Sequence, residues 1–152
     1  MKNILKTLLM VLAILMHISC TSTTTQPLSH SVTQSLDKSR VWQLVKIQGR
    51  DIDRTATPTT LVFNPEAHTL RGQTQCNTYS ADYTLSQPLS HSATQSLTIS
   101  NFQLSNVQCP DAEMNAETRY LSTLKKCTQL SLTATTLTLG NKNKALLEFE
   151  LR

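Results

Sequence analysis

The C-terminal part of the chain alternates apolar and polar residues in two consecutive stretches. In LSLTATTLTLG, leucines alternate with Ser and Thr, and in ALLEFEL the apolar residues Leu147, Phe149 and Leu151 alternate with Glu148 and Glu150. Because side chains on a strand point to opposite faces with period two, this pattern predicts strands with one buried and one solvent-facing side. Strands of this kind, joined by short polar turns, are typical of antiparallel sheets.

Five earlier segments have the same character. VWQLVKI (41–47) and TTLVF (59–63) are rich in β-branched residues and end at Gly49 and at Asn64-Pro65. Further strands are expected over 69–75, 81–85 and 97–104, which gives about seven or eight strands in all. In the first segment, alternation places Trp42, Leu44 and Lys46 on one side and Val41, Val45 and Ile47 on the other.

One helix is expected before the last three strands, beginning at Cys109-Pro110-Asp111. Proline is tolerated in a first turn, and Asp111 and Glu113 near the start and Lys125 and Lys126 near the end complement the helix dipole. An apolar stripe at helical spacing consists of Met114, Ala116, Tyr120, Leu121 and Leu124. The sequence therefore predicts a mainly β (α+β) fold: a curved antiparallel sheet, or half-open barrel, with one α-helix packed against its open side.

The first twenty residues read as a targeting segment. Lys2 and Lys6 precede the apolar run TLLMVLAILM, which is too short to span a bilayer comfortably. The run leads to Ser19-Cys20, which resembles a bacterial lipobox, although His17 stands where that pattern has Leu. We therefore expect a lipoprotein signal peptide over 1–20 with lipid attachment at Cys20, a palmitate-bearing anchor. The alternative is an ordinary signal peptide cleaved near Ser19, with Cys20 an incidental thiol.

Residues 21–40 are rich in Ser, Thr and Gln and are expected to be a flexible tether, followed by one domain over 41–152. Two nearly identical segments, QPLSHSVTQSL (26–36) and QPLSHSATQSL (87–97), fall in the tether and in an expected hairpin connection. Two copies so far apart cannot stack as a solenoid, so we interpret them as a duplication in two permissive polar sites. Their histidines, His30 and His91, would share a metal only if the tether folded back.

Composition and motifs argue against several classes of function. Without Lys2 and Lys6, the fourteen Lys and Arg fall to twelve against ten Asp and Glu, which is weak support for binding nucleic acid. His68 lies in an expected turn, and no histidine has zinc-ligand spacing to the cysteines. Asp51 and Asp53, flanked by Arg50 and Arg54, read as a solvated charge cluster. We expect no enzyme, no metal site and no cofactor.

The order of these motifs resembles the META domain family of HslJ-like bacterial envelope proteins. The resemblance rests on VWQLVKIQG, RGQTQCNTYSADY, VQC before the helix, ETRYLSTL, and LTLG with LEFEL, and it covers nearly all of 41–152. Two positions depart from the family pattern. Ala81 stands where the family has Gly, and SNVQC (105–109) replaces its Thr-x-Met-Ala-Cys.

The resemblance implies a disulfide between Cys76 and Cys109. Export to an oxidising compartment agrees with it, and closing a loop of that size would stabilise the fold by roughly 3–4 kcal/mol. Cys127 would then be left over as a small buried hydrophobe. The residues alone leave three pairings open, including Cys109 with Cys127.

From the family we expect a non-catalytic, stress-related or structural domain that contacts an envelope protein. Thr21 after Cys20 favours the outer membrane, facing the periplasm, and the domain is expected to be a monomer. The alternative is a small acyl-chain-binding or pilotin-like module that uses the groove between sheet and helix. A groove filled by Tyr120, Leu121 and Leu124 would favour the first interpretation, and exposed leucines along an open groove would favour the second.

Overall fold

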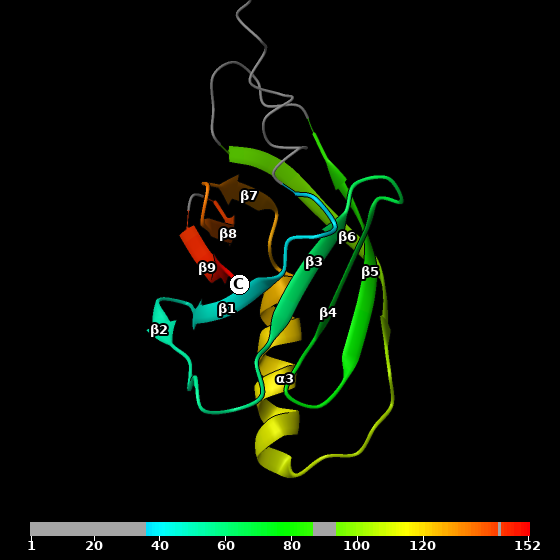
Figure 1. Ribbon diagram of the computed structural model, residues 1–152, viewed down its shortest axis with the longest axis vertical. Helices are drawn as coiled ribbons and strands as arrows, with labels where there is room; N and C mark the ends of the chain where they lie inside the picture. Colours follow the sequence, from blue (N-terminus) through cyan, green and yellow to red (C-terminus); the bar gives the residue numbers. More distant parts are fainter. Residues whose placement is uncertain (1–35, 87–93, 143) are drawn as a thin grey trace, which may run out of the picture.

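The computed structural model describes residues 36–86, 94–142 and 144–152. The expected signal peptide, Cys20, His30 and His91 lie outside these residues. Nine strands and one helix follow one another along the described chain, and Figure 1 labels them. They are β1 (Trp42–Ile47), β2 (Arg50–Asp51), β3 (Thr60–Asn64), β4 (Thr69–Gln73), β5 (Thr78–Leu85), β6 (Thr94–Leu104), α3 (Asp111–Leu124), β7 (Gln129–Leu132), β8 (Thr136–Asn141) and β9 (Lys144–Leu151).

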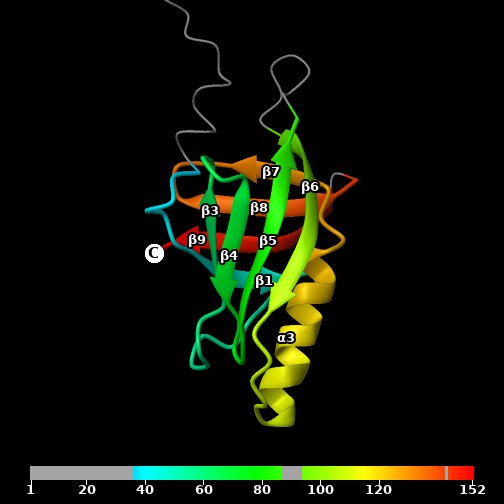
Figure 2. The ribbon, with the colours of Figure 1, turned by 90° about the vertical axis from the view of Figure 1, so that its right-hand side faces the viewer.

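All strand pairings are antiparallel, and they close the sheet on itself. The order runs β2-β1-β3-β4-β5-β6-β7-β8-β9, and β1 also pairs with β9 along most of its length. On its other edge, β1 pairs with β3 at Trp42 and Gln43 and with the short β2 at Lys46 and Ile47. Strands β3 to β6 form one layer, and β7, β8, β9 and β1 cross behind it (Figure 2). The mainly β fold with one helix is therefore confirmed.

The helix lies where the two layers separate. β6 pairs with β7 only over Thr94–Ser96, whereas its pairing with β5 extends as far as Leu104. The rest of β6 thus has no strand beyond it, and α3 lies alongside this part of the molecule (Figure 2). Lys125, just past the helix, lies over the Phe102 ring at 5.1 Å from its centroid. Among the described residues, no helix is long and apolar enough to cross a bilayer.

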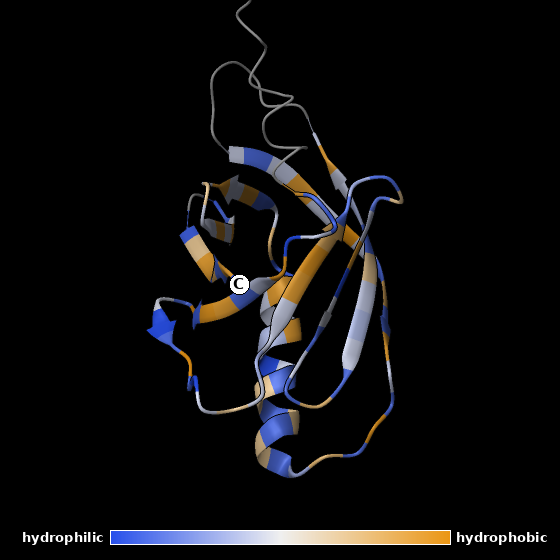
Figure 3. Cartoon of the chain, in the orientation of Figure 1, coloured by the Kyte–Doolittle hydropathy of each residue, from blue (hydrophilic) through white to orange (hydrophobic). Residues whose placement is uncertain are grey.

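The core occupies the space between the two layers and the helix. Leucine dominates it, as the low aromatic content suggests, and Trp42, Phe63 and Phe149 are the bulkiest apolar members. On β5 the alternation is regular, with Tyr79, Ala81 and Tyr83 buried. Figure 3 shows the same mixture of apolar and polar residues along neighbouring strands. Burial of one side of each strand therefore fixes which face of the sheet is inside.

One expected strand face is wrong because β1 contains an irregularity. The register with β9 shifts between Leu44 and Lys46, as at a β-bulge. Beyond that point the alternation changes phase, so that Ile47 joins Trp42 and Leu44 in the core. Lys46, expected beside them, faces outward and approaches Glu148 of β9 at 3.8 Å.

The last residues of the two copies of the repeated segment lie in the packed domain, whereas the sequence predicted exposed polar sites that tolerate insertion. Leu36, which ends the first copy inside the expected tether, is 1% exposed and belongs to the core. In the second copy, Thr94–Leu97 is the start of β6 rather than a loop, and Leu97 is buried. A leucine at the end of each copy therefore packs in the same core, and the packed domain extends upstream of Val41.

Candidate functional site

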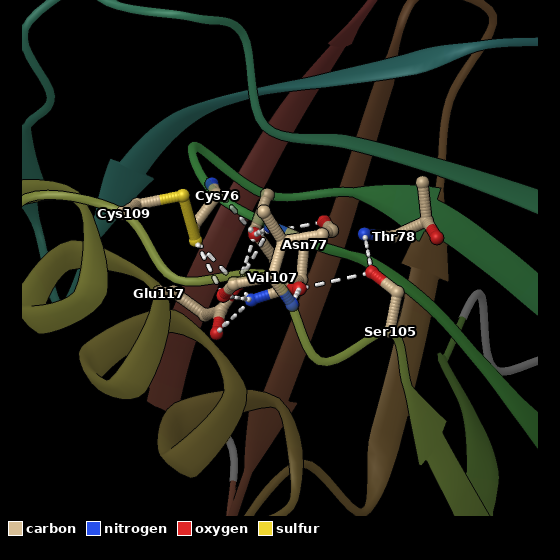
Figure 4. The surroundings of a disulfide bond; sticks show 8 residues. Cys76, Asn77, Thr78, Ser105, Val107, Cys109 and Glu117 are labelled. Carbon is tan, nitrogen blue, oxygen red and sulfur yellow. Dashed lines mark hydrogen bonds between the residues drawn. A yellow bond between two sulfur atoms is a disulfide. The ribbon is translucent and has the colours of Figure 1, made fainter.

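A cluster of hydrogen-bonded polar groups, several of them buried, joins the β4–β5 turn to the helix and to the segment before it (Figure 4). We call this set, made of Thr74, Asn77, Ser105, Val107 and Glu117, the polar clamp. Glu117 is 7% exposed, and its carboxylate accepts hydrogen bonds from the Asn77 backbone N–H at 2.9 Å and from the Asn77 side-chain amide at 3.1 Å. The Thr74 hydroxyl donates to it as well. These charge-assisted bonds offset the cost of burying the carboxylate.

Asn77 connects three segments at once. Its side-chain oxygen accepts from the Ser105 hydroxyl at 2.9 Å and from the Val107 N–H at 2.8 Å, while its amide reaches Glu117. The Ser105 oxygen also accepts from the Thr78 N–H at 3.1 Å. Buried asparagine is stable only when its donors and acceptors find partners, as here. The segment between β6 and α3 is therefore held against the β4–β5 turn.

A disulfide lies beside the polar clamp. Cys76 and Cys109 form it; their Cα atoms lie 5.9 Å apart, and the two residues are 33 positions apart in sequence. This is the pair that the family resemblance implies. Cys127, the alternative partner, is a free buried thiol whose pKa is raised by burial to about 12, so that it stays protonated near neutral pH. The disulfide thus ties together the same two segments that Asn77 joins.

The segment held by the clamp presents apolar side chains to solvent. Leu104 is 48% exposed and Val107 is 55% exposed, although they flank a tightly hydrogen-bonded region. Met114 in the first turns of α3 is also exposed, at 42%. Its expected place in the buried helix stripe is therefore wrong: the buried residues of the helix are Glu117, Tyr120, Thr123 and Leu124. We call Leu104, Val107 and Met114 the apolar rim.

A groove of about 550 Å³ lies on the outer side of the β3–β6 layer, and Leu104 contributes to it. Its lining is mixed, with Arg71 as the only charged residue. The lining residues are Thr60, Val62, Arg71, Gly72, Gln73, Thr78, Tyr79, Ser80, Gln103, Leu104 and Ser105. The groove therefore adjoins the segment that the polar clamp immobilises.

Two buried tyrosines lie under the groove. The Tyr79 hydroxyl donates to the Thr60 carbonyl at 2.9 Å and lies 2.6 Å from the Tyr120 hydroxyl, so Tyr120 donates to Tyr79. Burial raises the pKa of both phenols, and both stay protonated. Gly72 permits this arrangement, because a Cβ there would lie 1.9 Å from the Thr60 carbonyl oxygen and 2.6 Å from the Tyr79 hydroxyl.

The space between the sheet and the C-terminal half of the helix is filled. Tyr120 and Leu124 are buried, and Leu121 packs against the same core. Of the other residues that sequence reasoning singled out, His68 lies exposed in the β3–β4 turn with a positive φ of 53°. Within the described residues, no group of three or more His, Cys, Asp or Glu side chains is placed to hold a metal ion.

Sequence reasoning missed the role of Glu117. In the sequence it is one more charged residue on a helix, and its donors lie about forty positions upstream in the chain. Asn77 was part of the motif that carries the family resemblance, but its contacts were not foreseen. The one available signal was the pairing of that motif with a cysteine just before the helix.

Comparison with known proteins gives a family match and two similar structures. The family model described as META domain matches residues 34–152. No curated protein matches the chain. An NMR structure of a protein from Burkholderia xenovorans is 20% identical in sequence, with a TM-score of 0.61. The alignment covers 90% of this chain and 97% of the Burkholderia chain. A second NMR structure is 22% identical, with a TM-score of 0.54, and covers 75% and 90% respectively. At these identities the structures support the fold alone.

Proposed function

The chain belongs to the META domain family, and from this premise we propose that it is a lipid-anchored, non-catalytic domain of the bacterial envelope that binds an envelope protein. The binding face would be the apolar rim together with the groove on the β3–β6 layer. The observation that carries the proposal is the exposure of Leu104 and Val107 on a segment fixed by the disulfide and the polar clamp.

The physical argument concerns the cost of ordering a binding surface. An exposed apolar side chain on a mobile loop loses conformational freedom when a partner binds. Here the backbone of the segment has already lost this freedom on folding, because the Val107 N–H donates to the Asn77 side chain and Cys109 is in a disulfide. Preorganised apolar groups beside a groove of mixed lining are typical of surfaces that recognise other proteins.

The binding face can be tested by site-specific photo-crosslinking in a bacterial host. A photoreactive residue at Val107 should give a discrete crosslinked product with an envelope protein. The same residue at Thr135, which is exposed in the β7–β8 turn, serves as the control. L104D should remove the product while leaving thermal unfolding unchanged. Identical products from positions 107 and 135 would contradict the proposal.

The anchor is tested separately. Palmitate labelling should disappear in Cys20→Ser, and the protein should move from the membrane to the soluble fraction. Unchanged labelling would contradict lipid attachment at Cys20 without affecting the proposed binding face. Outer-membrane location and a role in envelope stress are parts of the proposal that sucrose-gradient fractionation and expression under heat shock would examine.

Acyl-chain binding remains the second candidate, but it has less support. Tyr120, Leu121 and Leu124 occupy the space between sheet and helix that a chain would need. Native mass spectrometry of the protein prepared with different lipids would separate the two candidates, since an acyl-binding module should retain lipid in some of them.

A further inference from the structure

Two adjoining hollows lie on the other side of α3, away from the apolar rim. The first, of about 240 Å³, is lined by residues of the β1–β2 hairpin with Ile52, Arg119 and Lys144. The second, of about 320 Å³, lies between α3 and residues 52–56, and Gln75 also lines it. They share Ile47, Ile52 and Arg119 as lining residues, so the two hollows lie side by side.

The first hollow gathers positive charge from three elements. Arg50 of β2, Arg119 of α3 and Lys144 of β9 line it, with Asp51 as its one acidic residue. None of the three cations forms an ion pair within the described part of the chain, whereas Lys38, Lys46 and Arg54 are paired elsewhere. Three cations beside one carboxylate leave a net positive potential, which favours an anionic group.

The second hollow carries the opposite charge. Asp53 and Glu113 line it together with apolar residues, among them Leu44, Ala116 and Tyr120. The Oε2 atom of Glu113 is buried and has no hydrogen-bond partner among the described residues. A carboxylate oxygen in this state is costly, because it has lost water and gained no donor. Because this oxygen is enclosed, a donor from outside the chain reaches it only after the Glu113 carboxylate turns toward the hollow that this residue lines.

We propose that the two hollows form one site for a small zwitterion. Its phosphate or carboxylate would lie among Arg50, Arg119 and Lys144, and its ammonium group would donate to the Glu113 carboxylate, with Asp53 nearby. A simple anion would leave Glu113 without a donor, and a simple amine would leave the three cations with the single carboxylate of Asp51. A ligand carrying both groups satisfies both halves, and this site does not depend on the proposed protein-binding face.

The test is an NMR titration of the full chain in a non-ionic detergent with O-phosphoethanolamine, which carries both groups. Backbone amide shifts should saturate for residues 47–53 and around Arg119. Glycerol 3-phosphate, which lacks the ammonium, should bind at least tenfold more weakly, since a charged hydrogen bond contributes about one factor of ten or more. Equal affinities for the two probes would overturn the zwitterion assignment, and shifts elsewhere or none at all would overturn the site.

Three variants sharpen the test. R119Q should weaken binding of both probes at least tenfold, whereas K126Q, which removes one charge just after the same helix and lines neither hollow, should leave both unchanged. E113Q should weaken binding of O-phosphoethanolamine but not of glycerol 3-phosphate. Arg119 and Lys126 are exposed, so folding should survive, and circular dichroism checks this. Equal losses in R119Q and K126Q would indicate nonspecific charge attraction and overturn the site.

The same chemistry could come from a lipid headgroup or from a free compound. The full chain reconstituted in phosphatidylcholine vesicles, with and without phosphatidylethanolamine, distinguishes the two. If the headgroup occupies the site, phosphatidylethanolamine should lower the apparent affinity for O-phosphoethanolamine. Phosphatidylcholine serves as the control because its headgroup has no ammonium N–H to donate to Glu113. An affinity that phosphatidylethanolamine does not change would support a free zwitterion as the ligand.

Discussion

Two glutamates one turn apart on the same helix have different surroundings. Glu117 is buried and accepts hydrogen bonds from Thr74 and Asn77. Glu113 is only partly buried, yet one of its oxygens is enclosed and has no partner among the described residues. The two residues are of the same type and lie on the same helix. The difference in their surroundings must therefore come from the residues that face each position across the fold.

What faces Glu117 is backbone and amide from the β4–β5 turn, brought there by strand pairing and held by a disulfide. What faces Glu113 is a hollow lined by residues 52–56 and the core. The first carboxylate is hydrogen-bonded within the fold, while the second keeps one oxygen without a donor among the described residues. Four predictions test this contrast between the polar clamp and the hollow, beginning with the largest expected effect.

Removing the disulfide should have the largest effect, and only on the clamp side. C76S/C109S should lower the free energy of unfolding by about 3–4 kcal/mol, on the chain-entropy account of a loop of this length. Urea unfolding of the variant and of the parent protein measures the loss. Adding E117A to this double variant should show coupling, because the Asn77 side-chain amide contacts both Cys76 Sγ and the Glu117 carboxylate, whereas adding E113A should be additive. Additivity in both cases would contradict the clamp as one unit.

Truncating the two glutamates should give clearly different costs. E117A removes the carboxylate that accepts from the Asn77 N–H, from the Asn77 side-chain amide and from the Thr74 hydroxyl. These donors keep only neutral acceptors, so the variant should cost about 2–3 kcal/mol. E113A removes no hydrogen bond of the described structure and should change stability by less than about 0.5 kcal/mol, as an ordinary surface substitution does. Matched thermal melts of the two variants, at the same pH, check the difference. Comparable losses would contradict the contrast.

The sheet was predictable because its cause is local in the sequence. Alternation along β5, β7, β8 and β9 follows directly from burying one face, and the helix followed from its own periodicity and charges. The extra ninth strand, β2, has two exposed residues and no apolar pattern. It exists because the turn at Gln48 and Gly49, both with positive φ, returns the chain against β1.

The site was less predictable because its causes are distant in sequence. The register shift in β1 depends on its pairing with β9, about a hundred positions away, and no local pattern signals it. Met114 has helical spacing to the core residues, but the first turns of α3 extend past the ends of the strands (Figure 2). The disulfide followed only from the family resemblance, since three cysteines in the mature chain allow three pairings.

A smaller effect is expected from the tyrosine pair, which is another satisfied buried polar contact. Y79F leaves both the Thr60 carbonyl and the Tyr120 hydroxyl without a partner and should cost about 1–2 kcal/mol. Y120F removes only one hydrogen bond, because Tyr79 keeps its contact with Thr60, and should cost less than about 1 kcal/mol. Chemical denaturation of both variants gives the order, and a larger loss in Y120F would show that Tyr120 does more than donate to Tyr79.

The smallest effect on stability is expected from E113Q, because two contributions to the free energy of unfolding oppose each other. Loss of a negative charge in the first turn of α3 weakens the interaction with the helix dipole by about 0.3–1 kcal/mol. A neutral amide costs less to enclose without a partner than a carboxylate oxygen does, and this acts in the other direction. The full cost of such an enclosed group, about 1–3 kcal/mol, is reduced here because Glu113 is only partly buried. We therefore expect a change within about 0.5 kcal/mol by urea unfolding.

Salt separates the two terms in E113Q. The dipole term is screened by added salt, so the variant should gain stability relative to the parent protein as ionic strength rises from low to about 1 M. E117Q, the matched variant one turn along, should stay destabilised at every salt concentration because its hydrogen bonds are buried. A loss in E113Q as large as in E117Q would mean that Glu113 has a structural partner after all, and that its oxygen is not available to a ligand.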